Sequence, residues 1–197
     1  MGKSNMNHPQ KNQNITVQPI RDLKAIRRIK RNLQDNPRDL LLFTLGINNG
    51  LRIGDLLRLK VQDVKELQPG ETFTITEQKT GKPNVLMINK EVRRGLAVYL
   101  DALKPNDQDY LFKSRKGENQ PLNRSYVNSL IKKWTLGLKG NFGTHSLRKT
   151  FGFIQRKMFG VSFEVLCKRF NHSNPSVTMR YLGIEDKEVN GILLNEI

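Results

Sequence analysis

The sequence has few of the residues with which proteins bind metal ions or form covalent cross-links. Among 197 residues there are one cysteine, Cys167, and three histidines. A single cysteine excludes an internal disulfide, and because Cys167 lies in an apolar helical pattern we interpret it as a small buried side chain. Without further cysteines or clustered carboxylates, a His/Cys metal site is not expected. We therefore predict a protein without a metal ion.

Long apolar runs and phosphate-binding loops are also missing. No apolar stretch approaches the roughly 20 residues that a membrane span requires. Residues 1–18 are polar and lack the apolar stretch of a signal peptide, which predicts a cytoplasmic protein without a membrane partner. No Gly-x-x-x-x-Gly-Lys-Ser/Thr loop is present, so no nucleotide cofactor is expected.

Positive charge is what the sequence has in excess. Lysine and arginine number 34 against 18 aspartates and glutamates, a formal net charge of +16. Residues 161–197 hold four basic and five acidic residues, a net charge of −1, so the first 160 residues carry +17. Such an excess repels itself unless a polyanion compensates it. We therefore predict a nucleic-acid surface within the first 160 residues.

The first third of the chain has a helical pattern after a polar start. Residues 1–18 show no periodicity and are predicted to be disordered. Apolar residues then recur at helical spacing from Ile20 to Ile29. Asn36 and Pro37 have the pattern of a helix cap followed by proline. The helix that they start is apolar nearly all round, which predicts burial, and Gly50 is expected to end it. Residues 53–59 form a further short helical pattern.

A single segment has the alternation of a β-hairpin. Residues 72–76 alternate and are rich in β-branched and aromatic side chains, and residues 85–88 form the predicted return strand. Residues 79–82 between them are a predicted turn with glycine at a position of positive φ. Residues 110–112 are a further candidate for a short piece of strand.

The rest of the chain has helical patterns. Helices are expected over residues 91–103, 123–138, 144–160, 163–170 and from 175 through Tyr181, with caps at Asn123, Thr144, Ser162 and Asn174. A last amphipathic helix is expected from Asp186 to the end. The predicted fold is mainly α with a small antiparallel β-hairpin (α+β). Its parts are a polar segment (1–18), one domain (19–185) and a C-terminal helix or tail (186–197).

A few side chains have the chemistry needed to act on a phosphodiester. His145 and Arg148 lie three residues apart on one helical face near an N-terminus, where anions are favoured. Arg52 lies between Leu51 and Ile53, which suggests a guanidinium near the interior that needs an anionic partner, either Asp55 or a substrate phosphate. Arginines, lysines, an imidazole and a phenol suit the stabilisation of a phosphorane.

Three blocks, in this order, resemble the tyrosine recombinase (phage integrase) family. They are residues 50–59 (GLRIGDLLRL), 144–150 (THSLRKT) and 171–181 (NHSNPSVTMRY). Between the first two, residues 79–82 (KTGK) lie on the predicted hairpin, where the family keeps its catalytic lysine. The match spans residues 20 to 185, nearly all of the family's catalytic domain. The chain departs from the family at Phe170 and Asn171, where leucine and glycine are usual, and at Gly183, where a histidine often follows the tyrosine.

The resemblance implies a mechanism and a set of catalytic residues. Tyr181 would attack the scissile phosphate to form a 3′-phosphotyrosine, and no cofactor would be needed. The implied catalytic residues are Arg52, Lys79, His145, Arg148, His172 and Tyr181. The implied partners are double-stranded DNA and further copies of the chain, as a dimer to tetramer on DNA. Residues 186–197 would either pack on their own domain or dock on a neighbouring protomer.

Other functions fit part of these observations. A type IB topoisomerase uses a similar set of residues but relaxes supercoils as a monomer. A non-catalytic DNA-binding accessory protein would not need all six residues. A basic RNA-binding protein fits the charge but leaves the ordered residues unexplained. Many members of the family have an N-terminal domain that clamps DNA, and we do not expect this domain in a chain of 197 residues. The chain is thus expected to be a short recombinase or an excised catalytic domain, used in integration, excision or inversion of a mobile element.

Overall fold

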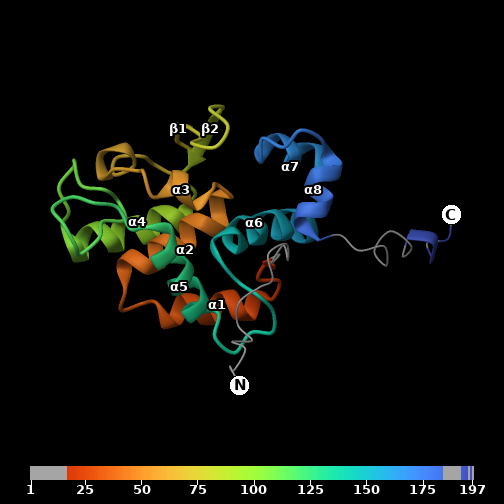
Figure 1. The fold of residues 1–197 in the computed structure, drawn as a ribbon, viewed down its shortest axis with the longest axis horizontal. Helices are drawn as coiled ribbons and strands as arrows, with labels where there is room; N and C mark the ends of the chain where they lie inside the picture. Colours follow the sequence, from red (N-terminus) through yellow and green to blue (C-terminus); the bar gives the residue numbers. More distant parts are fainter. Residues whose placement is uncertain (1–16, 184–191, 195, 197) are drawn as a thin grey trace, which may run out of the picture.

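The computed structural model describes residues 17–183, 192–194 and 196. Helices predominate, with one small antiparallel sheet, which confirms the predicted fold class (Figure 1). In chain order the elements are α1 (Leu23–Asn32), α2 (Pro37–Asn49), α3 (Ile53–Leu56), η1 (Val61–Asp63), β1 (Thr72–Thr76), β2 (Pro83–Met87), α4 (Lys90–Leu103), α5 (Arg124–Trp134), α6 (Thr144–Phe159), α7 (Phe163–Arg169), α8 (Pro175–Leu182) and η2 (Ile192–Leu194).

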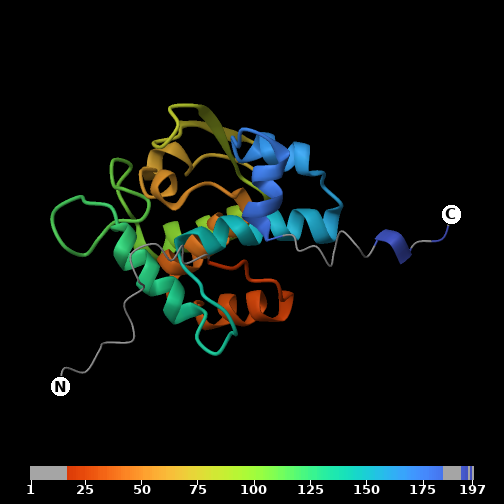
Figure 2. The ribbon, with the colours of Figure 1, turned by 45° about the vertical axis from the view of Figure 1, so that its right-hand side comes forward.

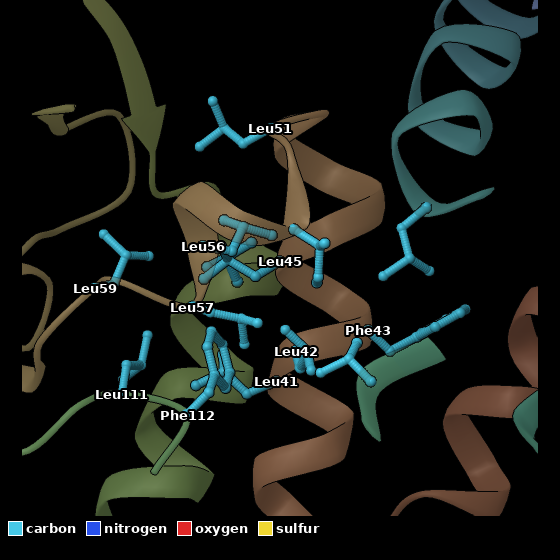
Figure 3. Close-up of a cluster of buried hydrophobic side chains, with 14 of the residues drawn as sticks. Leu41, Leu42, Phe43, Leu45, Leu51, Leu56, Leu57, Leu59, Leu111 and Phe112 are labelled. Carbon is cyan, nitrogen blue, oxygen red and sulfur yellow. The ribbon is translucent and has the colours of Figure 1, made fainter. Parts of the chain in front are cut away.

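Helix α2 forms the centre of the molecule. Its side chains Leu41, Leu42 and Phe43 are fully buried, and α1, α4 and α6 pack against it. Leucines from the segment after α2 and the Leu111–Phe112 pair fill the space on one side of it (Figure 3). The apolar pattern thus predicted both the helix and its burial correctly. Gly50 ends the helix in the left-handed conformation, at φ 60°.

The hairpin is the two-stranded sheet predicted from the alternating pattern. Strand β1 has the predicted bounds, whereas β2 starts at Pro83, two residues before the predicted return strand. Phe73 pairs with Leu86, and Ile75 pairs with Asn84. The candidate strand at residues 110–112 is wrong, since Tyr110 makes only an isolated bridge with Lys60.

Several predicted helix ends are confirmed and others are wrong. Asn123, Ser162 and Asn174 cap their helices with side-chain hydrogen bonds, as predicted. Thr144, in contrast, is the first residue of α6 and not its cap, because Gly143 takes that position and donates its N–H to Ser146 Oγ. Helix α5 ends at Trp134, four residues before the predicted end.

The hairpin and α1 lie at opposite ends of the molecule (Figure 1, Figure 2). The hairpin, α3, α7 and α8 lie at one end, and α1 lies at the other, in both views (Figure 1, Figure 2). The C-terminal end of α2 therefore points to the hairpin and to α7 and α8, next to the start of α3. The helix predicted from Asp186 lies outside the described residues, apart from the short turn η2. No helix in the described part of the chain is long and apolar enough to cross a membrane.

Candidate active site

Four of the six predicted catalytic residues line one cavity of about 580 Å³. Arg52 comes from the junction of α2 and α3, and Lys79 from the turn between β1 and β2. His145 and Arg148 come from the first turns of α6. Residues 96 positions apart in the sequence, Arg52 and Arg148, thus meet at the end of the molecule where α2 stops.

Tyr181 and His172 lie directly beside this cavity. The Tyr181 hydroxyl is 3.4 Å from His145 Nδ1. The His172 ring lies edge-on to the Tyr181 ring, with their centroids 5.2 Å apart. His172 Nδ1 is 2.9 Å from Thr178 Oγ1 on α8, a contact that fixes the orientation of the imidazole. All six residues predicted from the sequence therefore lie together.

Arg148 is a buried guanidinium with two structural hydrogen bonds. Its side chain is 2% exposed. Nη1 donates to the Gly50 carbonyl and Nη2 to the Phe170 carbonyl, both at 2.7 Å. The guanidinium also stacks on the Phe170 ring, 4.5 Å from its centroid. Burial lowers the pKa of Arg148 to about 10, so it keeps its charge at neutral pH. Since a guanidinium has five N–H groups, others remain available for an anion.

Arg52 has a buried acidic partner, but it is not Asp55. Arg52 Nη1 forms an ion pair with Glu77 Oε2 at 2.6 Å, and Glu77 is fully buried. Asp55 instead accepts the backbone N–H of Gln78 at 2.9 Å and so holds the start of the hairpin turn. Of the two partners left open from the sequence, Asp55 and a substrate phosphate, Asp55 is thus not the ion-pair partner of Arg52. Hydrogen bonds from Thr80, Asn84 and Arg52 outweigh burial and lower the pKa of Glu77 to about 2.

The protonation states of the other groups follow from burial and from the two arginines. Burial raises the pKa of the Tyr181 hydroxyl to about 12, although the charges of Arg148 and Arg52 offset part of this effect. Burial and the same two arginines lower the pKa of His172 to about 4. Burial and nearby cations also lower the pKa of His145. At neutral pH the site therefore holds a neutral phenol and neutral imidazoles among cations, an arrangement that suits attack of a hydroxyl on an anionic phosphate.

The departures at Phe170 and Asn171 fit this geometry. Asn171 has φ 51°, in the left-handed region where glycine is favoured and asparagine is the next most tolerated residue. Phe170 is fully buried, and its ring contacts Arg148, His172 and Tyr181. The larger ring thus packs against three of the candidate catalytic residues at a position where the family usually has leucine.

Sequence reasoning missed other residues of this region. Glu77, Asn84 and Arg169 connect the hairpin to α7 by hydrogen bonds. Arg124, at the start of α5, lines the cavity and donates a hydrogen bond to Gln78. Lys149 is buried, with its ammonium 4.9 Å from the centroid of the Tyr181 ring. No local pattern in the sequence indicates that a charged side chain such as Glu77 or Lys149 will be buried. Within the described residues, no group of three or more His, Cys, Asp or Glu side chains could hold a metal ion.

This arrangement defines a class of site, in which a tyrosine lies beside a cavity lined with cations that can hold a phosphodiester. The model of the phage integrase family matches residues 20–188 of the chain. The probable integrase/recombinase YoeC of Bacillus subtilis (strain 168) is 39% identical over 175 residues, which cover 86% of this chain and 91% of that protein. The tyrosine recombinase XerA of Pyrococcus horikoshii is 29% identical over 158 residues, 79% of this chain and 53% of that protein.

Solved structures agree in fold. The crystal structure of the XerA recombinase superposes with a TM-score of 0.74 at 22% identity, covering 91% of this chain and 67% of that one. The post-cleavage complex of the XerH site-specific recombinase with its palindromic difH substrate has a TM-score of 0.71 at 19% identity, covering 90% and 52%. The chain therefore belongs to the phage integrase family of tyrosine recombinases. It spans about half the length of the XerA sequence and nearly all of YoeC.

Proposed function

We propose that this protein is a site-specific recombinase that cleaves and rejoins duplex DNA through a covalent bond to Tyr181. The observation that carries the proposal is the meeting of Arg52, Lys79, His145 and Arg148 at one cavity, with the Tyr181 hydroxyl 3.4 Å from His145. Membership of the tyrosine recombinases supports the reaction class. In the cleavage step the Tyr181 oxygen bonds to phosphorus, and the bond from phosphorus to the 5′-oxygen breaks.

Arg52 and Arg148 hold the two non-bridging oxygens of the scissile phosphate. Guanidinium groups suit this role because they donate hydrogen bonds in a planar fork and stay charged. The two carbonyls that accept from Arg148 fix its plane, so it needs little reorganisation when the phosphate becomes a phosphorane. His172, whose Nδ1 contacts Thr178, hydrogen-bonds to a non-bridging oxygen through its other ring nitrogen.

Two groups move the protons. His145 is the group close to the Tyr181 hydroxyl, and its lowered pKa keeps it neutral, so it can accept the phenolic proton. Lys79, exposed on the hairpin turn, donates a proton to the departing 5′-oxygen. A phenol with a pKa of about 12 needs such a base, since little phenolate exists at neutral pH.

The phosphotyrosine ester conserves the free energy of the broken phosphodiester, so a 5′-hydroxyl can reverse the attack without a nucleotide cofactor. The partner is double-stranded DNA, and the net charge of +16 supports this choice. We further propose assembly as a dimer to tetramer on DNA, a role in a mobile element and a cytoplasmic location. Residues 186–197 either dock on a neighbouring protomer or pack on their own domain.

Replacement of Tyr181 by phenylalanine tests the nucleophile. The variant keeps the ring contacts with Phe170 and His172 but lacks the attacking oxygen. On a nicked suicide substrate, from which the released strand diffuses away, the wild-type protein should accumulate a covalent adduct. The Tyr181→Phe variant should form none while it binds the same DNA with unchanged affinity. An adduct in the variant at the wild-type level would show that another residue is the nucleophile.

A second assay separates recombination from the topoisomerase alternative. The protein is incubated with supercoiled DNA that carries two target sites found by mapping the covalent adducts. A recombinase gives exchanged products. Relaxation of the supercoils without any exchanged product would fit a type IB topoisomerase instead.

A further inference from the structure

A hydrogen-bonded chain of three side chains lies behind the candidate active site. We call Glu77, Asn84 and Arg169 the clasp. Glu77 starts the hairpin turn, two residues before Lys79, and its Oε1 accepts from Asn84 Nδ2 at 2.9 Å. Asn84 lies on β2, and its Oδ1 accepts from Arg169 Nη1 at 2.7 Å. None of the three has a role in the mechanism proposed above.

Arg169 extends the clasp to two further parts of the fold. It is the last residue of α7, and its Nη1 also donates to the Val85 carbonyl on β2 at 2.9 Å. Its Nε donates to the Asn49 carbonyl at 3.1 Å, at the C-terminal end of α2. The Arg169 carbonyl in turn accepts from Asn84 Nδ2 at 3.3 Å. The hairpin, α2 and α7 thus meet at one guanidinium.

The other end of the clasp reaches the phosphate-binding residues. Glu77 Oε2 forms the ion pair with Arg52 and also accepts from Thr80 Oγ1 at 2.7 Å, within the turn that bears Lys79. A fully buried carboxylate is costly unless charges and donors surround it. Here Arg52, Asn84 and Thr80 supply them, so the carboxylate constrains all three elements from which these side chains come.

A two-stranded hairpin has little stability of its own and takes its position from what it packs against. Lys79 is exposed on the turn, whereas a proton donor must lie within hydrogen-bond reach of the leaving oxygen. The attacking phenol lies on α8, which follows α7 after a short loop and packs on it. The relative placement of donor and nucleophile therefore depends on how the hairpin is joined to α7.

We propose that the clasp is a positioning device that fixes the Lys79 turn relative to the α7–α8 segment, so that the proton donor and Tyr181 face one phosphate together. This inference rests on the roles proposed above for Lys79 and Tyr181. Asn84 is the residue to test, because it joins Glu77 to Arg169 and does not line the cavity.

The test compares two suicide substrates that differ at the leaving atom. In one, the phosphorus–oxygen bond to the 5′-oxygen breaks, and the alkoxide needs a proton. In the other, sulfur replaces the 5′-oxygen, the phosphorus–sulfur bond breaks, and a thiolate leaves with its electron pair. Because a thiol has a pKa of about 8.5, the thiolate departs without a proton donor. Loss of Lys79 function should therefore slow only the oxygen substrate.

The Asn84→Ala variant should form adduct about tenfold more slowly on the oxygen substrate, from the loss of hydrogen bonds to charged partners. On the sulfur substrate, which needs no proton donor, its rate should lie within about threefold of the wild type. Lys79→Ala is the positive control and should show the same pattern with a larger loss. Thr74→Ala, an exposed change on the same hairpin, should have the wild-type rate on both substrates.

Other outcomes would overturn the inference. An unchanged Asn84→Ala rate on the oxygen substrate would show that the clasp does not position Lys79. An equal loss on both substrates would show that Asn84 supports the site only in general. If this variant does not fold, Arg169→Lys, which keeps the positive charge but loses the planar guanidinium fork, takes its place and should show the same selective loss. If the wild-type protein forms no Tyr181 adduct on either substrate, the proposed function itself fails.

Discussion

Replacement of Arg148 by lysine keeps the positive charge but removes the planar fork. The guanidinium donates to the Gly50 and Phe170 carbonyls, each at 2.7 Å, and is 2% exposed. A lysine ammonium is a single point of charge and cannot reproduce the fork that donates to both carbonyls. A hydrogen bond from a charged donor contributes about 1.5–3 kcal/mol, and a buried carbonyl left without a partner costs about 1–3 kcal/mol. We therefore expect the free energy of unfolding to fall by about 3 kcal/mol.

Thermal and urea unfolding measure this loss. For a chain of this length, about 3 kcal/mol corresponds to a drop in Tm of roughly 6–12 °C. The matched control is Arg124→Lys, the same change at an exposed residue that lines the same cavity. It should alter the unfolding free energy by less than about 0.5 kcal/mol. Adduct formation by Arg148→Lys should fall by about 10²–10³, by analogy with the loss of an oxyanion donor. If Arg148→Lys unfolds at the wild-type temperature, the two carbonyl contacts do not hold the site together.

Two further predictions concern backbone strain at a glycine and the loss of folding stability at low pH. Gly50→Ala should lower the unfolding free energy by about 2–4 kcal/mol in urea, because Gly50 has φ 60° and the added methyl would collide with the Phe151 ring. Gly81→Ala, at φ 66° with open space around it, should cost only about 1 kcal/mol, and equal losses would refute the collision. The second prediction concerns low pH. Burial and the charges of Arg148 and Arg52 lower the pKa of His172 from 6.5 to about 4. The folded state then binds fewer protons than the unfolded state. The contribution of His172 to the free energy of unfolding is therefore fully present above pH 6.5 and is lost as the pH drops towards 4. We expect a loss of about 2 kcal/mol after allowance for partial exposure. His172→Gln should remove this part of the pH dependence in urea titrations at pH 7 and pH 4.5.

Local patterns were sufficient where the physical cause is local. The caps at Asn123, Ser162 and Asn174 were predicted because each side chain bonds to a backbone N–H three residues away. Burial of α2 followed from its apolar side chains on every face. The same reasoning failed at Thr144, because the preceding Gly143 and the Ser146 hydroxyl form the cap instead. Neighbouring residues with similar capping ability cannot be distinguished by sequence alone.

Long-range partners were not predictable in the same way. Asp55 is close to Arg52 in sequence and was the natural candidate for its counter-ion, yet Glu77 on the hairpin occupies that position. Which carboxylate reaches the guanidinium depends on how the hairpin folds back over α3. For the same reason, nothing in the pattern around Asn84 or Arg169 indicated that they would bond to each other across 85 residues.

The sequence by itself determined most of the helices and the hairpin, because side-chain periodicity, caps and turn residues act over a few positions. The blocks that contain Arg52, Lys79, His145, Arg148, His172 and Tyr181 were found by their resemblance to the tyrosine recombinases. Only the tertiary structure decided that α2 ends where α6, α8 and the hairpin meet, so that these six residues lie together. Only it decided that a buried glutamate balances Arg52 and that two backbone carbonyls orient Arg148. These contacts depend on the packing of elements that are distant in the chain, and no local pattern in the sequence specifies them.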